Sequence, residues 1–318
     1  MIVTVTLNAA MDRTLSVPNF RVGHRHRASD GLASAGGKGI NVARALKRLG
    51  VPVVCTGLAG GTNGTQILED LTREGILNDF VRIAGESRTS FAVLDPIANA
   101  YTEINEWGPQ VSAEELEVLR GKLDYLTQGA SVLVLAGSLP RAVDNGFYAE
   151  LVRDFGRRLP VVVDSDGEPF RLAVESEPEL VSPNMSEAEA LVGHEFADDD
   201  ELAHGLDEIA ELGAKNVLLT VEDGCYALAH EDREAVRLRA VAPRLEPVST
   251  VGAGDVLLAG YLAAREGGRS AEDAVRTAVA AGAASVLEAG AGRFDAREAG
   301  RLATLVEVER LEPVAYER

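Results

Sequence analysis

The chain has 318 residues, of which 46% are hydrophobic and 25% charged, so it holds enough apolar material for a large core and is not a disordered protein. Its formal net charge of −19 argues against nucleic acids and acidic membranes as partners, because such a surface repels both. The sequence contains neither a run of about 18 apolar residues nor a basic stretch leading into an apolar one, so we expect a cytoplasmic protein.

The first half of the chain alternates β-branched or apolar runs with helical patterns. The expected strands are 2–7, 51–60, 87–96 and 100–105. The expected helices are 36–50, 64–76 and about 112–127. Two stretches, about 10–30 and 87–107, have strand-like pieces without a helix partner. We therefore expect them to form a small separate sheet over the main one.

In the second half the alternation of strand and helix is strict. Short apolar strands are expected at 131–137, 160–167 and 216–221, with a helix at about 144–158. This pattern predicts an α/β fold with a mainly parallel sheet covered on both faces. An antiparallel edge is expected at 225–230 and 235–242, and buried helices at about 253–266 and 271–289. The expected organisation is one domain over 1–318 with a small β appendage.

The segment STVGAGDVLLAG (249–260) places small residues directly before an expected helix. The backbone amides of Gly252, Ala253 and Gly254 would lie uncovered at the positive end of the helix dipole, which suits a phosphoryl group. It is not a Walker loop, because no Gly-Lys-Ser/Thr follows. Asp255 has two open interpretations, a carboxylate that stabilises the helix dipole or a general base beside an anion site.

A second glycine cluster, ASAGGKGINVARAL (33–46), contains a partial dinucleotide-binding pattern. A Rossmann fingerprint should follow the first strand directly, and here about thirty residues intervene. We favour an acceptor site, in which Gly36 and Gly37 admit a ligand to the backbone while Lys38 and Asn41 present polar ends. Further on, in PNMSEAEAL (183–191), Asn184 and Glu187 would share a helix face, either as a capping pair or as groups that order hydrated Mg²⁺.

Taken together, these segments resemble the ribokinase-like (PfkB-type) carbohydrate kinases. GGKGINVARALKRLG (36–50) is similar to the N-terminal signature of that family and STVGAGDVLLAG to its C-terminal one, with TLNAAMD (6–12), GSLP (137–140) and PNMSEAE in the family's order between or before them. The resemblance covers essentially the whole chain and implies a three-layer α/β/α fold with a small β-sheet lid. TLNAAMDRTL and SRTSFAVLD most resemble the sugar-phosphate branch, which includes 1-phosphofructokinases and tagatose-6-phosphate kinases.

The resemblance also implies roles for particular residues. Asp255 would be the catalytic base, with the amides of Gly252, Ala253 and Gly254 as the anion hole. The sugar hydroxyls would be held by Asp12, Gly37, Lys38 and Asn41, and the existing phosphate of the sugar by Arg88, with Lys38 also near it. Asn184 and Glu187 would order Mg²⁺ through water together with the nucleotide phosphates, and Gly224, in the loop after strand 216–221, would lie at the nucleotide.

The implied reaction is phosphorylation of fructose 1-phosphate to fructose 1,6-bisphosphate, with ATP and Mg²⁺ as cofactors and a monovalent cation left open. Tagatose 6-phosphate and fructose 6-phosphate are the alternative acceptors. A non-catalytic sugar-phosphate sensor is the alternative from a different class. The implied partners are the phosphorylated sugar, ATP and a second copy of the chain, bound through the lid.

Overall fold

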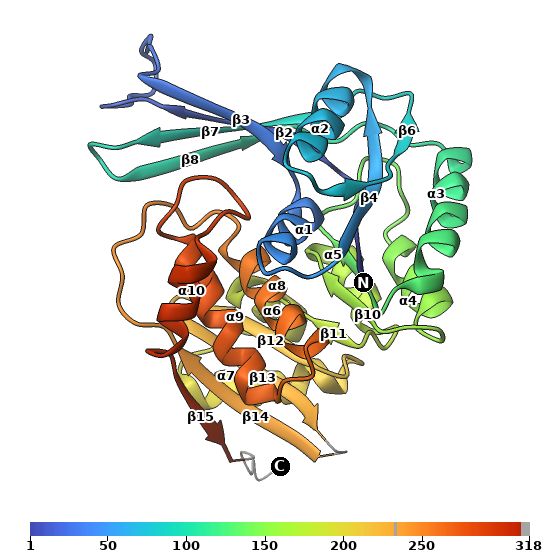
Figure 1. Cartoon of the computed structure of the whole chain (residues 1–318), viewed down its shortest axis with the longest axis vertical. Helices are drawn as coiled ribbons and strands as arrows, with labels where there is room; N and C mark the ends of the chain where they lie inside the picture. Colours follow the sequence, from blue (N-terminus) through green and yellow to red (C-terminus); the bar gives the residue numbers. More distant parts are fainter. Residues whose placement is uncertain (232–233, 313–318) are drawn as a thin grey trace.

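The main sheet is the scaffold of the molecule (Figure 1). The computed structural model describes residues 1–231 and 234–312 of the chain. Within these residues the main sheet has 11 strands in the spatial order β15-β14-β13-β12-β11-β10-β9-β1-β4-β5, with β6 also paired to β4. Strands β12, β11, β10, β9, β1, β4, β5 and β6 are parallel to one another. Strands β13, β14 and β15 each run antiparallel to the preceding strand at this edge of the sheet. Their bounds are β1 (Ile2–Thr6), β4 (Val53–Gly60), β5 (Leu77–Asn78), β6 (Val81–Ile83), β9 (Val132–Ala136), β10 (Val161–Asp164), β11 (Leu180–Val181), β12 (Val217–Val221), β13 (Gly224–Glu231), β14 (Glu234–Val241) and β15 (Glu307–Leu311).

Each face of this sheet carries its own hydrophobic core, because successive strand residues point to opposite sides. In β1, Ile2 belongs to one core, whereas Val3 and Val5 belong to the other. The first core is covered by α1 (Lys38–Arg48), α2 (Gly61–Arg73), α8 (Ala253–Glu266), α9 (Ala271–Ser285) and α10 (Ala296–Ala303). The second is covered by α3 (Ala113–Leu126), α4 (Phe147–Phe155), α5 (Gly167–Val174), α6 (Met185–Val192) and α7 (Asp199–Glu211). The predicted α/β fold with a mostly parallel sheet is confirmed.

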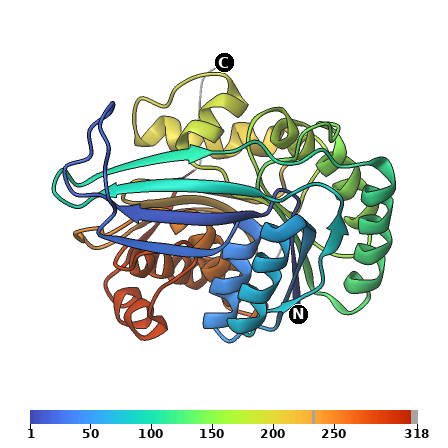
Figure 2. The same cartoon turned by 90° about the horizontal axis from the view of Figure 1, so that it is seen from above.

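The predicted small sheet is also present. Its strands are arranged in the order β3-β2-β7-β8, with β2 at Ala10–Ser16, β3 at Asp30–Gly36, β7 at Arg88–Asp95 and β8 at Ala100–Asn105. Asp12 pairs with Ser90, which pairs with Asn105, so these polar side chains share one face. Phe91 and Ile104 are paired on the opposite face, onto which Figure 2 looks and which no other described element covers.

Several boundaries differ from the sequence-based expectations. The expected helix at 36–50 begins only at Lys38, because β3 continues to Gly36 and Gly37 adopts a φ of 118° as the N-cap. Residues 30–36 therefore belong to the small sheet, beyond the expected limit of about 30. Their Ala, Ser and Gly residues have weak strand propensity, and the strand exists because it pairs with β2. Helices α5, α7 and α10 and strand β15 were not predicted.

The buried helices expected near the C-terminus are α8 and α9, and α8 has the predicted bounds. They pack closely because small residues face one another. A Cβ added at Gly260 would lie 2.9 Å from the Cα of Ala278. Helix α9 ends at Ser285, four residues before the expected limit. In the described part of the chain, no helix combines the length and apolar character that a membrane crossing requires.

Candidate active site

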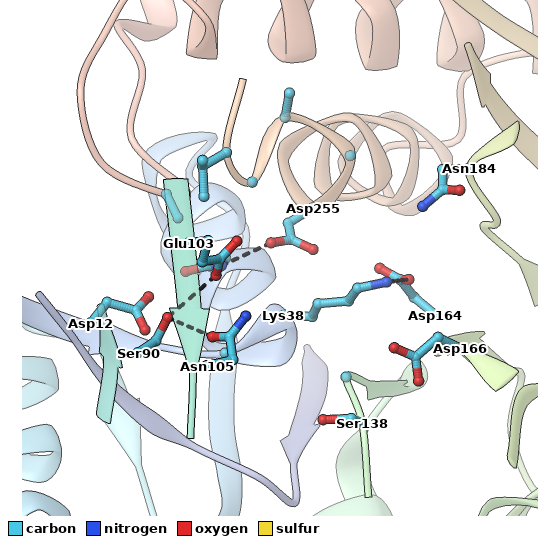
Figure 3. Close-up of a pocket in the computed structure, with 18 of the residues that line it drawn as sticks. Asp12, Lys38, Ser90, Glu103, Asn105, Ser138, Asp164, Asp166, Asn184 and Asp255 are labelled. Carbon is cyan, nitrogen blue, oxygen red and sulfur yellow. Dashed lines mark hydrogen bonds and ion pairs between the residues drawn. The ribbon is translucent and has the colours of Figure 1, made fainter. Parts of the chain in front are cut away.

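A cavity of about 970 Å³ lies where the carboxyl ends of the parallel strands meet the small sheet. Open α/β sheets generally bind their ligands at this edge. In Figure 3 the side chains from the small sheet, Asp12, Ser90, Glu103 and Asn105, lie on one side of the cavity, and Asp164, Asp166 and Asn184 lie on the other. Asp255 lies between the two groups. The cavity therefore brings together residues that are far apart in the sequence.

The start of α8 forms the floor of this cavity. Gly252 is the N-cap with a φ of 77°, a left-handed conformation that favours glycine, and a Cβ at this position would lie 2.9 Å from the Cβ of Ala291. A Cβ added at Gly254 would meet no atom within 4 Å, so the backbone there faces open space. The side of the helix start that the expected phosphoryl group would approach is thus uncovered.

The amides of this loop are not equivalent. The Ala253 N–H donates a hydrogen bond of 3.2 Å to the carbonyl oxygen of Thr250, as part of a turn. The N–H groups of Gly252 and Gly254 donate to no other group in the described residues. Of the three amides expected to bind an anion, that of Ala253 is used by the turn that shapes the loop, whereas those of Gly252 and Gly254 are uncommitted in this conformation.

Asp255, in the first turn of α8, is only 6% exposed. Its carboxylate does not cap the helix. Instead, its Oδ2 atom accepts a hydrogen bond of 2.8 Å from Nδ2 of Asn41 on α1. Of the two interpretations left open by the sequence, this geometry favours a base that faces the cavity over a group that serves only the helix dipole.

The surroundings of Asp255 hold its pKa near neutrality. Burial raises the pKa of this carboxyl to about 7, and the negative charge of Asp164 acts in the same direction. The charge of Lys38 and the hydrogen bond from Asn41 act in the opposite direction. A carboxylate with such a pKa is well suited to accept a proton near neutral pH.

Lys38, the first residue of α1, bridges to the opposite side of the cavity. Its Nζ atom lies 2.7 Å from Oδ1 of Asp164 and 3.2 Å from Oε1 of Glu187. Burial alone would lower the pKa of Lys38, but the two carboxylates outweigh this effect and hold the pKa above its ordinary value. Lys38 is therefore a fixed positive charge, close to Asp255 and to the start of α6.

Asn184 and Glu187 form a reciprocal capping box at the start of α6. The backbone N–H of each residue donates to the side chain of the other, over 2.9 Å in both directions. Because its other carboxylate oxygen contacts Lys38, Glu187 has a partner for both oxygens. No group of three or more carboxylate, His or Cys side chains suited to a metal ion occurs in the described residues.

On the small sheet, Asp12 and Arg88 face the cavity from neighbouring strands. Burial raises the pKa of the Asp12 carboxyl to about 6, against the attraction of Arg88. The hydrogen bonds that Arg88 donates are long, 3.3 Å to the carbonyl oxygen of Asn8, 3.3 Å to Oδ1 of Asn105 and 3.5 Å to the carbonyl oxygen of Glu106. Its guanidinium is therefore available to an anion that binds in the cavity.

The glycines of the N-terminal cluster have packing reasons that the sequence did not reveal. A Cβ at Gly36 would lie 1.9 Å from Oδ2 of Asp12, and one at Gly37 would lie 2.6 Å from Cγ2 of Thr6. Gly37 also lines the cavity. Gly224, expected at the nucleotide, is not among the residues that line the cavity. It lies at the start of β13, and a Cβ there would be 1.9 Å from the carbonyl oxygen of Ala240. The nearby lining residues are instead Thr220, Val221 and Glu222.

Comparison with known proteins agrees with this geometry. Residues 3–297 match the model of the pfkB family of carbohydrate kinases. The chain belongs to this family. It is 35% identical over 290 residues to a 1-phosphofructokinase of Borreliella burgdorferi, covering 91% of this chain and 92% of that protein. It is 31% identical to a 1-phosphofructokinase of Rhodobacter capsulatus, covering 98% of this chain and 99% of that one.

Among solved structures, the phosphofructokinase-2 of Escherichia coli in complex with fructose-6-phosphate superposes with a TM-score of 0.86 at 27% identity, covering 96% of this chain and 98% of that one. The pfkB kinase described here is therefore a phosphotransferase with an alcohol group as acceptor, and it uses ATP and a sugar phosphate.

Several lining residues of this pfkB kinase escaped the sequence-based reasoning. Asp164 is the last residue of the buried strand β10 and Asp166 lies two residues beyond it, a position that could have identified them. Glu103 and Asn105 lie two residues apart in β8 with Ile104 between them, and this spacing places both polar side chains on one face, next to Ser90 of β7. That this face is turned toward the cavity follows from the pairing of the small sheet, which the sequence pattern alone does not specify.

Proposed function

We propose that this kinase transfers the γ-phosphoryl group of ATP to the free primary hydroxyl of fructose 1-phosphate, giving fructose 1,6-bisphosphate. The observation that carries the proposal is the position of Asp255. This buried carboxyl, with a pKa of about 7, lies at a glycine-rich helix start and in the same cavity as the polar face of the small sheet. The 1-phosphofructokinases similar to this chain support the choice of acceptor.

In this mechanism Asp255 accepts the proton of the acceptor hydroxyl as the oxygen attacks the γ-phosphorus. The uncovered amides of Gly252 and Gly254, at the positive end of the α8 dipole, stabilise the charge that spreads over the phosphoryl oxygens. Lys38, expected at the sugar, contacts Asp164 and Glu187 instead, so in this proposal its positive charge acts on the side of the nucleotide. Asp12 and Asn41 hold sugar hydroxyls, and Arg88 holds the phosphate that the sugar already carries.

The residues opposite the small sheet fit a nucleotide. Thr220, Val221 and Glu222 line the cavity beyond the α8 loop, and the open space at Gly254 can admit a phosphate. Asn184 and Glu187 fit Mg²⁺ held through water rather than by direct ligation, because their polar groups already have partners in the capping box and the described residues offer no cluster of metal ligands. When bound, Mg²⁺ would neutralise phosphate charge.

The small sheet is proposed as a lid over the sugar and as the contact of a homodimer, within a single kinase domain over 1–318. Its inner face carries Asp12 and Ser90 toward the cavity. On its outer face Phe91 and Ile104 are paired, and Ile104 is 61% exposed. Large apolar side chains exposed side by side on a sheet favour burial against a partner. Sedimentation at several protein concentrations tests the dimer, and the Ile104→Lys variant should shift it to monomers.

Fructose 6-phosphate and tagatose 6-phosphate are the alternative acceptors. The phosphofructokinase-2 that superposes on this chain is described in complex with fructose-6-phosphate. For this reason fructose 6-phosphate is included among the acceptors to be assayed. The deciding experiment is a coupled assay of ATP consumption with fructose 1-phosphate, fructose 6-phosphate, tagatose 6-phosphate and fructose. We expect the highest kcat/KM with fructose 1-phosphate. A higher value with either 6-phosphate would overturn the acceptor assignment.

A non-catalytic sensor is the competing function. It predicts binding of sugar phosphate without turnover of any acceptor in the same assay. Asp255→Asn provides the matched test of the base, since the side chain keeps its size and loses its ability to accept the proton. We expect this variant to retain binding of sugar phosphate and to lose about 10²–10⁴-fold in kcat. Turnover equal to that of the unchanged enzyme would refute the role of Asp255.

A further inference from the structure

Polar residues recur at intervals of three along α1, and the first two of them have a place in the proposed mechanism. Lys38 contacts Asp164, and Asn41 contacts Asp255. The third residue, Arg44, follows one helical turn after Asn41 and is only 3% exposed. A buried arginine requires partners for its charge and its donors, so its contacts are informative.

The guanidinium of Arg44 has four partners, three from other segments of the chain and one from α1 itself. Its Nε atom lies 2.6 Å from Oε2 of Glu74, which balances the charge. Nη2 donates over 2.8 Å to the carbonyl oxygen of Ala35, at the end of β3. Nη1 donates over 3.1 Å both to the carbonyl oxygen of Ala291 and to Oδ1 of Asn41. Arg44 therefore joins the small sheet, the loop after α9 and the residue that contacts Asp255.

The contact with Asn41 has a directional consequence. A guanidinium only donates hydrogen bonds, so the atom of Asn41 that faces Arg44 must be the carbonyl oxygen. The NH₂ group of Asn41 is then left on the side of Asp255, where it donates over 2.8 Å. An ionised carboxylate only accepts hydrogen bonds, so Arg44 on one side and the ionised Asp255 on the other require the same orientation of the Asn41 amide. Without Arg44, the reversed amide would be compatible with a protonated Asp255.

We propose that Arg44 is a positioning residue, which fixes the amide of Asn41 so that its NH₂ group, and not its oxygen, faces Asp255. This inference rests on the proposed role of Asp255 as the base. Arg44 is not itself a lining residue of the cavity, and it contacts the lining from behind, through Asn41 and the carbonyl oxygen of Ala291. Its effect is to favour the ionised form of Asp255, which is the form that can accept the proton of the acceptor hydroxyl.

Other charged groups also act on Asp255, and the test must separate Arg44 from them. Asp164 on β10 and Glu187 on α6 oppose ionisation of Asp255, whereas Lys38 at the start of α1 favours it. None of these three groups is among the hydrogen-bond partners of Arg44. Substitution of Arg44 therefore leaves their direct contacts in place and changes the support of Asn41. It also removes a positive charge that lowers the pKa of Asp12, a second carboxyl in the cavity. A shift that arises from Asp12 would persist when Asn41 is absent, so the Asn41→Ala background separates the two effects.

The test is the dependence of kcat on pH, measured with fructose 1-phosphate from about pH 5.5 to about pH 9, where the acid limb reports the base in the bound complex. We expect Arg44→Met to move the midpoint of this limb upward by about 0.5–1 pH unit, the effect of one hydrogen bond. Arg44→Lys, which keeps a group that only donates, should restore most of the shift. Arg48→Met is the matched control, because Arg48 is on the same helix and donates to the carbonyl oxygen of Phe294 without touching Asn41.

A double substitution shows whether Arg44 acts through Asn41. In an Asn41→Ala background, Arg44→Met should produce no further change in the midpoint. If Arg44→Met lowers kcat equally at every pH, or shifts the midpoint equally in both backgrounds, the proposal is wrong and Arg44 is structural. If Arg44→Met does not fold, Arg44→Gln replaces it, since a glutamine amide allows both orientations of Asn41. Full turnover in Asp255→Asn would instead refute the base itself, independently of these results.

Discussion

Replacing the proposed base should make the ligand-free protein more stable, not less. Asp255 has an ordinary pKa of 3.8 when the chain is unfolded and a pKa of about 7 when it is buried in the fold. Between these values the folded state binds more protons than the unfolded state, so stability falls as the pH rises. The difference, 7 minus 3.8, corresponds to an upper limit of about 4 kcal/mol, fully present above pH 7.

Asp255→Asn removes this penalty because the amide has no charge to bury. At pH 8 we expect the variant to gain up to about 4 kcal/mol in free energy of unfolding, and at pH 5 up to about 2 kcal/mol, since the gain disappears as the pH falls toward 3.8. Guanidinium or urea unfolding of both proteins at the two pH values measures the difference.

The chain offers a matched control for this experiment. Asp273 is the third residue of α9, as Asp255 is of α8, but its side chain is exposed. Asp273→Asn should therefore not stabilise the protein. Equal stability of Asp255→Asn and the unchanged protein at pH 8, or a gain that does not vary with pH, would refute the conclusion that burial of this carboxyl opposes folding.

Three further outcomes are expected. Arg88→Ala should raise KM for the sugar phosphate by about 10-fold or more with a smaller effect on kcat in the coupled assay, whereas Arg13→Ala, on the other face of the same sheet, should leave KM unchanged. Gly254→Ala should lower kcat while the free energy of unfolding, measured in urea, changes by less than about 0.5 kcal/mol, because its Cβ enters open space beside the phosphoryl site. Trp107, the single tryptophan, is 78% exposed at the cavity with Arg141 over its ring, so saturating sugar phosphate should shift its fluorescence if the lid closes. An unchanged spectrum would contradict closure over Trp107.

The start of α8 shows how much local sequence can reveal. Small residues followed by an aspartate and an apolar run predict a helix that begins at Ala253, and the structure has it there. The glycine pattern also identified the loop that lies in the cavity. It did not reveal that the Ala253 amide is used by Thr250, because that bond depends on how the loop turns. Backbone hydrogen bonds of irregular segments have no periodic signal in a sequence.

Contacts between distant segments account for the rest of what was missed. The pairing of Asn184 with Glu187 was recognisable from a spacing of three, whereas the contact of Glu187 with Lys38 joins residues 149 positions apart. Strand β15 was overlooked because its residues, EVERL, are mostly charged, and it is a strand because β14 offers an open edge. Hydrophobic periodicity thus predicts elements that bury a face, and it fails where pairing with another element decides the structure.

The connections between the small sheet and the rest of the chain limit how the acceptor preference of this kinase can change in evolution or by design. Strand β3 ends at Gly36 and α1 begins at Lys38, so one residue joins the covering sheet to the helix that supports the reaction. Strands β2 and β7 likewise carry Asp12 and Arg88 near the points where they enter the small sheet. A sheet transplanted from a related enzyme, by recombination or in the laboratory, would bring these groups with it. Acceptor preference and catalytic alignment are therefore expected to be inherited as one unit.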